Sequence, residues 1–302
     1  MVTDCENSPD LFPQERVYVA CDLCGADDPE FLFEKEEFRH VRCRRCGMVY
    51  VTPRLREIIE QQEVFYDMLA RYSGGIEELV AREYSGNRKR NLRREAAKYL
   101  IYRTSGHILD IGCGFGGFLL AASERGWQYP EGIEIAPQAA EYAGKRFTIR
   151  IQPLEEVHYE ADYFDVVRAN NVIEHLSSPK AMVRAVHRIL RPGGLFAFSA
   201  PNFDSFSVKL LGRKWPYIRG DHHVYLFGPK TLTRLLEENG FRVVRVSTKG
   251  VHLRPKDHTC GRSKIRLSRY SYALSGGAER VLDLIVRRTL KGNRLKLWAE
   301  KA

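Results

Sequence analysis

Several features are missing from this sequence of 302 residues, and each absence narrows its classification. No apolar run reaches the length of about eighteen residues that a membrane-spanning helix requires. The first ten residues carry three acidic groups and no basic one, whereas a secretory signal has a basic start and an apolar core. Internal repeats and low-complexity tracts are also missing. These absences predict an ordinary globular protein of the cytoplasm, with enough apolar residues to fill a core.

Cysteine is scarce, yet four of the seven cysteines form two C-x-x-C pairs separated by eighteen residues. In a reducing compartment, this spacing predicts a metal site rather than disulfides. Four thiolates saturate a tetrahedral zinc ion and leave no position for a reactive water, so we expect a structural zinc ribbon within residues 1–60. A glycine follows each pair, as the tight turn of such a site requires. The predicted ligands are Cys21, Cys24, Cys43 and Cys46.

The positive charge is concentrated in the last third of the chain. The net charge is +10, but residues 201–302 hold 22 basic and 8 acidic groups, while residues 1–60 hold 8 basic and 13 acidic groups. The acidic ribbon therefore gives little support to nucleic-acid binding through Arg44 and Arg45. A basic surface attracts phosphates, and the open alternatives are nucleic acid, an anionic membrane surface and a substrate that carries phosphate.

The order of the elements predicts an α/β protein. Residues 61–106 have a helical pattern and form the expected helical connector. From residue 107 onward, short apolar strands such as "HILDIG" alternate with amphipathic helices such as "PKAMVRAVHRIL". This alternation is typical of a doubly wound, Rossmann-like sheet with helices on both faces.

A glycine loop follows the first of these strands. Gly112, Gly114 and Gly117 fit the G-x-G-x-x-G pattern of nucleotide-binding loops, and Glu134 lies about twenty residues on, where an acid can accept both ribose hydroxyls. Asp110 precedes the loop, and its carboxylate would repel the pyrophosphate of a nicotinamide cofactor. S-adenosylmethionine has no phosphate and carries an ammonium and a sulfonium group. An acid beside the loop therefore favours S-adenosylmethionine.

Four motifs in order, "ILDIGCGFGGF", "GIEIAPQA", "FDVVRANNVIEHLSSP" and "LRPGGLFAFSAPN", resemble those of class I S-adenosylmethionine-dependent methyltransferases. The similarity is to the branch of ubiquinone-pathway O-methyltransferases, which also includes enzymes of cell-surface glycan and natural-product pathways, some with an N-terminal zinc ribbon. The resemblance implies a seven-stranded, mostly parallel sheet in a catalytic domain over residues 107–302, with a basic insertion at about 249–291. It implies these cofactor-binding residues: Asp110, Gly112, Cys113, Gly114, Glu134, Ile135, Leu154, Glu155, Asn170 and Asn171.

Three histidines are candidates for the general base that takes a proton from the acceptor. His175 lies in "VIEHL", and His222 and His223 lie in "RGDHHVYLF", both after strands whose carboxyl ends should face the ligands. Neutral imidazole suits a base near pH 7. A packed, capping or loop-ordering role is the competing interpretation for each of them.

Three functions remain open at this point. The first is O- or C-methylation of a small-molecule or glycan-type acceptor, such as a nucleotide-linked or lipid-linked sugar, whose phosphates would meet the basic last third. The second is RNA methylation, with the ribbon and the basic tail holding RNA. The sequence lacks an N-P-P-Y-like motif, which disfavours methylation of base amines. The third is a non-catalytic scaffold, and peripheral membrane contact through the basic C-terminal third is a further expectation.

Overall fold

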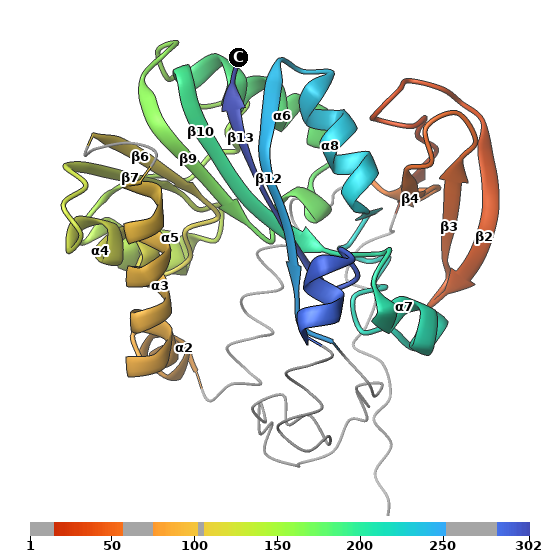
Figure 1. Cartoon of the computed structure of the whole chain (residues 1–302), viewed down its shortest axis with the longest axis horizontal. Helices are drawn as coiled ribbons and strands as arrows, with labels where there is room; N and C mark the ends of the chain where they lie inside the picture. Colours follow the sequence, from red (N-terminus) through yellow and green to blue (C-terminus); the bar gives the residue numbers. More distant parts are fainter. Residues whose placement is uncertain (1–14, 57–74, 102–105, 252–282) are drawn as a thin grey trace, which may run out of the picture.

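The computed structural model describes residues 15–56, 75–101, 106–251 and 283–302. Its elements form a small N-terminal sheet and a larger α/β unit (Figure 1). The strands are β1 (Arg16–Val17), β2 (Pro29–Lys35), β3 (Phe38–Cys43), β4 (Val49–Val51), β5 (Arg54–Leu55), β6 (His107–Ile111), β7 (Tyr129–Ile133), β8 (Thr148–Arg150), β9 (Phe164–Asn170), β10 (Leu190–Pro201), β11 (Tyr225–Leu226), β12 (Phe241–Lys249) and β13 (Arg294–Lys301). The helices are α2 (Ile76–Glu83), α3 (Gly86–Tyr99), α4 (Gly117–Ser123), α5 (Pro137–Gly144), α6 (Pro179–Ile189), α7 (Phe206–Leu211) and α8 (Pro229–Glu237), with short 3-10 turns at Ile173–His175 and Gly212–Lys214.

The central sheet confirms the predicted seven strands, in the order β12-β13-β10-β9-β6-β7-β8. Strands β8, β7, β6, β9 and β10 are mutually parallel, and β13 runs antiparallel between β10 and β12. The point where the chain order reverses lies at β6, between β7 and β9. In open α/β sheets, ligands bind beyond the carboxyl ends of the strands at this position.

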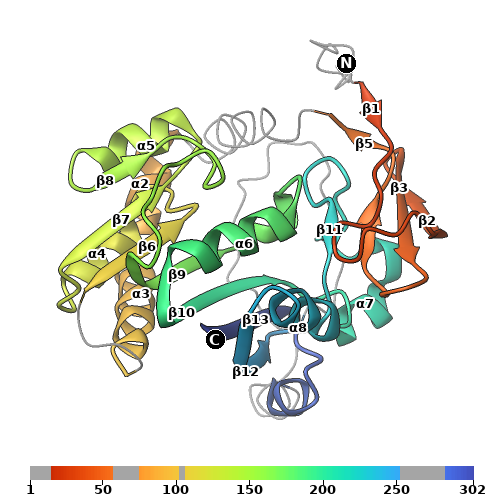
Figure 2. The same cartoon turned by 90° about the horizontal axis from the view of Figure 1, so that it is seen from above.

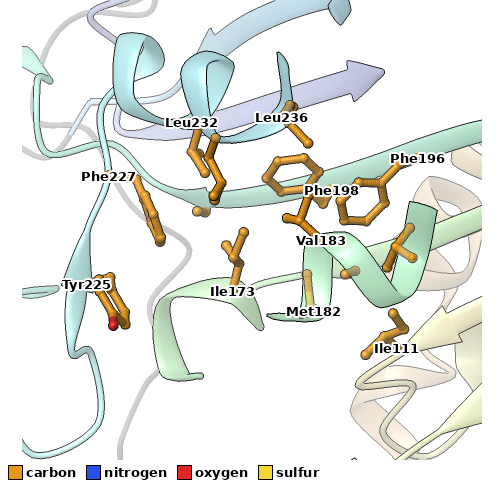
Figure 3. Packing of buried hydrophobic residues seen from close by; sticks show 14 of the residues in the cluster. Ile111, Ile173, Met182, Val183, Phe196, Phe198, Tyr225, Phe227, Leu232 and Leu236 are labelled. Atoms are coloured by element: carbon orange, nitrogen blue, oxygen red, sulfur yellow. The ribbon is translucent and has the colours of Figure 1, made fainter. Parts of the chain in front are cut away.

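Side chains alternate between the two faces of the sheet, and each face has its own core. Phe196 and Phe198 of β10 face α6 and α8, where they pack near Val183 and Leu236 (Figure 3). Leu195 and Ala197 of the same strand belong to the opposite core, with residues of α3 and α4. Within residues 61–106, where a helical pattern is expected, α3 packs on this face of the sheet.

The N-terminal sheet has the order β11-β4-β3-β2, and it includes a strand from the α/β unit. Tyr225 pairs with Tyr50, and Leu226 pairs with Val49. One continuous hydrophobic core joins Leu23 and Met48 of the ribbon to Phe227 of the α/β unit. The two parts therefore pack as a joined structure, which the view from above also shows (Figure 2).

Two sequence expectations fall partly outside the described residues. Most of the basic insertion at 249–291 belongs to the range 252–282, and part of the connector belongs to 57–74. The boundaries 1–60, 61–106 and 107–302 stay predictions. In the portion of the chain that is described, no helix combines the length and the apolar character needed to cross a membrane.

Candidate active site

The glycine loop is held against the end of β7 by backbone hydrogen bonds. The amides of Gly112 and Cys113 both donate to the carbonyl oxygen of Ile133, at 2.8 and 3.0 Å. The amide of Gly114 donates to Glu134 Oε2 at 2.8 Å, and the other carboxylate oxygen accepts from the amide of Ala136 at 3.0 Å. Glu134 is buried and joins the loop to the next strand, so the predicted ribose acid also orders the loop.

The first position of the loop requires glycine, because its backbone conformation and its close neighbour leave no room for a side chain. Gly112 has φ +69°, and a Cβ there would lie 2.7 Å from Val172 Cγ2. The amide of Gly117, at the start of α4, donates to Glu83 Oε1 of α2 at 3.1 Å. An acidic side chain thus occupies the helix N-terminus, where a dinucleotide cofactor would place its pyrophosphate. This arrangement fits a cationic ligand rather than a phosphate.

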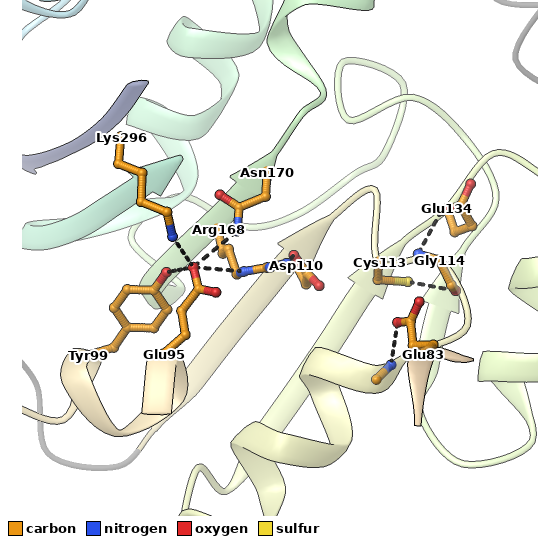
Figure 4. Close-up of polar contacts among 11 residues, drawn as sticks. Glu83, Glu95, Tyr99, Asp110, Cys113, Gly114, Glu134, Arg168, Asn170 and Lys296 are labelled. Atoms are coloured by element: carbon orange, nitrogen blue, oxygen red, sulfur yellow. Dashed lines mark hydrogen bonds and ion pairs between the residues drawn. The ribbon is translucent and has the colours of Figure 1, made fainter. Parts of the chain in front are cut away.

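Asp110 forms a buried ion pair below the loop (Figure 4). Its Oδ1 accepts a hydrogen bond from Arg168 Nη1 at 2.6 Å, and its Oδ2 has no hydrogen-bond partner among the described residues. Burial raises the pKa of Asp110 to about 7, although Arg168 opposes this shift. A buried acceptor atom without a partner is costly, and an ammonium group of a bound ligand would satisfy it.

Several polar side chains on the same face of the sheet bind to Glu95 of α3 (Figure 4). Its Oε1 accepts hydrogen bonds from Tyr99 Oη and Asn170 Nδ2, both at 3.0 Å, and from Lys296 Nζ at 3.3 Å. Arg168 Nε lies 3.7 Å from the same oxygen. Burial alone would raise the pKa of Glu95, but Arg168 and Lys296 lower it well below the usual range. The carboxylate is therefore ionised and fixes α3 to β9 and β13.

These groups line a cavity of about 940 Å³, near the upper end of the size range of small-molecule sites, roughly 300–1,000 Å³. All ten residues predicted to bind the cofactor lie in its wall, together with His175 and His222. His223 is not part of the wall. The cavity brings the glycine loop and two of the three candidate bases into one space, while the individual roles of these residues stay predictions.

The three histidines pack against one another beyond β9. The ring centroids of His175 and His222 lie 5.6 Å apart, and those of His175 and His223 lie 4.7 Å apart. Nδ1 of His175 donates to the carbonyl oxygen of His222 at 3.0 Å, because a carbonyl can only accept. Burial lowers the pKa of His175 to about 4 and that of His223 well below its usual value, so both are neutral at pH 7. Nδ1 of His222 lies 3.0 Å from Asp221 Oδ2.

Glu174 lies beside this group and is fully buried. Potential ligand atoms of Glu174, His175 and His223 lie within 4.8 Å of one another, a set that could hold a metal ion. Burial raises the pKa of Glu174 to about 8, so the carboxyl group is mainly protonated at neutral pH.

The four cysteines of the ribbon form a second group of side chains that could hold a metal ion. Their sulfur atoms lie within 4.8 Å of one another, with Cys21 and Cys46 Sγ 3.3 Å apart and Cys24 and Cys43 Sγ 3.5 Å apart. Tetrahedral zinc with Zn–S bonds of about 2.3 Å places its sulfurs about 3.8 Å apart, so the donor set and its dimensions fit zinc. The glycines after each pair, Gly25 and Gly47, have φ +73° and +78°, as the predicted turns require.

The ribbon contacts the segments that carry the histidines. Asp22, next to Cys21, accepts hydrogen bonds from Ser178 Oγ at 2.6 Å and from the amide of Lys180 at 2.8 Å. Arg54 donates to the carbonyl oxygen of Ser177 at 2.7 Å and to Tyr225 Oη at 3.0 Å. Both contacts hold the start of α6, and the pairing of β11 with β4 holds the strand that begins two residues after His223.

Sequence reasoning missed Glu83, Glu95, Arg168 and Lys296. One signal was available, because Arg168 interrupts the apolar strand "FDVVRAN", and a charged residue inside a buried strand requires a buried partner. No sequence pattern indicates that Glu95 of α3 is this partner or that Lys296 joins them, because the three residues come from distant segments.

Comparisons with known proteins agree with this geometry. The family model described as "Methyltransferase domain" matches residues 79–246. The ubiquinone biosynthesis O-methyltransferase of Methylobacterium nodulans is 32% identical over 193 residues, which cover 60% of this chain and 73% of that protein. The protein of the same name from Coxiella burnetii is 26% identical over 162 residues, which cover 49% of this chain and 68% of that protein.

Solved structures share the fold. A SAM-dependent methyltransferase from Archaeoglobus fulgidus superposes with a TM-score of 0.52 at 22% identity, covering 78% of this chain and 100% of the other. A second SAM-dependent methyltransferase, from Thermotoga maritima, superposes with a TM-score of 0.53 at 16% identity, covering 81% of this chain and 100% of the other. With the family model matching over half of its length, the chain belongs to the class I S-adenosylmethionine-dependent methyltransferases.

Proposed function

We propose that this enzyme methylates a hydroxyl oxygen of a small-molecule or glycan-type acceptor. The relatives named above are O-methyltransferases, which supports oxygen as the acceptor atom. The observation that carries the proposal is that one cavity wall contains both the glycine loop and His222. A hydroxyl group must lose its proton during the transfer, and a histidine in the same cavity can accept it.

Bound S-adenosylmethionine supplies an electrophilic methyl group on a cationic sulfur. Asp110 Oδ2, which lacks a hydrogen-bond partner among the described residues, would accept from the ligand's ammonium group, and Glu134 in the cavity wall would accept from the ribose hydroxyls. In a direct transfer the acceptor oxygen would take this methyl group and the electron pair of the broken bond would stay on sulfur, while His222 would take the proton of the hydroxyl group. The protein contributes mainly by holding the oxygen and the methyl group in line.

His222 is the general base that we favour. Its Nδ1 donates to the carboxylate of Asp221, which leaves Nε2 as the acceptor for the hydroxyl proton and stabilises the resulting imidazolium. Burial alone would raise the pKa of Asp221, but the hydrogen bond from His222 and the charge of Arg219 lower it. This carboxylate is therefore ionised. His175 also faces the cavity, but its pKa of about 4 makes it a weak base.

We further propose that the ribbon holds a structural zinc ion. All four ligand positions would be filled by thiolates, so the ion would stabilise the ribbon and take no part in methyl transfer. Through Asp22, Arg54 and β4, the folded ribbon would hold the segments on both sides of the histidine group.

The proposal is tested first by binding and then by transfer. S-adenosylmethionine and S-adenosylhomocysteine should raise the melting temperature, and a panel of hydroxylated sugars and phenols, with and without phosphate, should identify an acceptor. His222→Gln should lower kcat by about 10²- to 10⁴-fold while the affinity for S-adenosylhomocysteine changes less than about twofold. The exposed His158→Gln is the matched control. No stabilisation by either cofactor form would refute the assignment, and full activity of His222→Gln would refute the role of that base.

A further inference from the structure

One side of the cavity carries a group of four cations, Arg245 and Lys249 of β12 with Arg294 and Lys296 of β13, which we call the basic row. All four side chains lie in the cavity wall. In the antiparallel register, Lys249 is opposite Arg294, and Ser247 is opposite Lys296. Alternate residues of a strand share a face, so the row lies on the same face of the sheet as Arg168 and Asn170.

The basic row is short of compensating negative charge. Lys296 pairs with Glu95 at 3.3 Å, whereas Lys249 and Arg294 have no ion-pair partner among the described residues. Like charges directly opposite each other on paired strands are destabilising, so the pair of Lys249 and Arg294 lowers the stability of this part of the sheet. Burial together with Lys296 and Arg294 lowers the pKa of Lys249, which indicates the same crowding of positive charge. Such an arrangement is expected where a ligand supplies the missing anion.

The two ends of the cavity differ in their charged groups. The glycine-loop end carries the carboxylates of Glu83, Asp110 and Glu134, with Arg168 paired to Asp110, and the other end carries the basic row. Glu95 and Asn170 stand between the two ends, linked at 3.0 Å (Figure 4). A cationic cofactor fits the first end, so the second end remains for an anionic part of the acceptor.

We infer that the basic row is a binding site for a phosphate or diphosphate group of the methyl acceptor. This inference rests on the proposed function and narrows the acceptor to phosphate esters and diphosphates, whether soluble or lipid-linked. Lysine and arginine form charge-assisted hydrogen bonds with phosphate oxygens, and the anion would neutralise the cations that face each other across β12 and β13. The row would hold the acceptor by its phosphate and leave its hydroxyl group near the methyl group.

The experiment titrates inorganic pyrophosphate into protein saturated with S-adenosylhomocysteine, followed by calorimetry at low ionic strength. The test variant is Lys249→Gln combined with Arg294→Gln. The matched control is Arg242→Gln, which removes a cation from the same strand outside the cavity wall. Affinity for S-adenosylhomocysteine and the melting temperature are measured for every variant, so loss of the cofactor site or of the fold is seen separately.

We expect the double variant to bind pyrophosphate at least about tenfold more weakly, because two contacts to a charged group are lost. The control should stay within about twofold, and cofactor affinity should be unchanged in both. Failure of the wild-type protein to bind pyrophosphate while it binds S-adenosylhomocysteine would overturn the inference and leave the methyltransferase assignment intact. A parallel fall in cofactor affinity in the double variant would also overturn it, since the cations would then serve the cofactor's own carboxylate.

Two further probes identify the source of the phosphate. Binding of farnesyl diphosphate at least tenfold more tightly than pyrophosphate would support the inference with a lipid-linked acceptor. Equal binding of the two would support it with a soluble one. Displacement of pyrophosphate by single-stranded RNA, with a steep dependence on salt, would overturn the assignment to a small acceptor.

Discussion

Replacing Asp22 tests how strongly the ribbon stabilises the segment of the catalytic domain that it contacts. The carboxylate of Asp22 accepts hydrogen bonds from Ser178 Oγ and the amide of Lys180, both at the start of α6. Ser178 also caps this helix by accepting from the amide of Ala181 at 3.2 Å. Asp22→Ala removes the two hydrogen bonds that Asp22 accepts from this segment but leaves the cap itself in place.

The expected loss follows from the two contacts. Hydrogen bonds to a charged group contribute roughly 1.5–3 kcal/mol each. Asp22 is only partly buried, so water replaces part of what is lost. We therefore expect Asp22→Ala to lower the free energy of unfolding by about 2–3 kcal/mol, with the larger effect on the region around α6.

Urea unfolding of the zinc-loaded protein measures this change as a lower midpoint at an unchanged m-value. Hydrogen exchange should show faster opening in the first turn of α6. Asp27→Ala, an exposed acid in the same knuckle, is the matched control and should stay within about 0.5 kcal/mol of wild type. Equal midpoints for the two variants would refute the coupling of the ribbon to α6 through Asp22.

Two further predictions concern the cofactor and the metal. Because burial raises the pKa of Asp110 to about 7, and only the ionised form attracts the cofactor's ammonium group, S-adenosylmethionine should bind about five- to tenfold more tightly at pH 7.5 than at pH 6. Calorimetry at the two pH values checks this, and an affinity independent of pH would contradict the placement of the ammonium group. The purified protein should contain one zinc ion per chain, and Cys46→Ser should lose most of it whereas Cys113→Ala should retain it. Equal zinc content of these two variants by elemental analysis would show that the ribbon is not the site.

The sequence predicts well those features that are encoded by neighbouring residues. The cysteine pairs, the glycine loop after a strand and the position of Glu134 all depend on short spacings, because one turn or one strand–helix unit brings these groups together. The resemblance to methyltransferases adds the strand count, since the four motifs follow the chain in the family's order.

The tertiary structure alone decides the features that join distant segments. It pairs β11 with β4, buries Arg168 between Asp110 and Glu95, and brings Lys296 to Glu95 across 201 residues. It also excludes His223 from the cavity wall, although His222 beside it faces the cavity. Charge counts placed the positive charge in the last third, but they could not show that four of its cations line the cavity. Strand register and packing determine these neighbours, because side-chain burial and ion pairing depend on which surfaces meet rather than on local spacing.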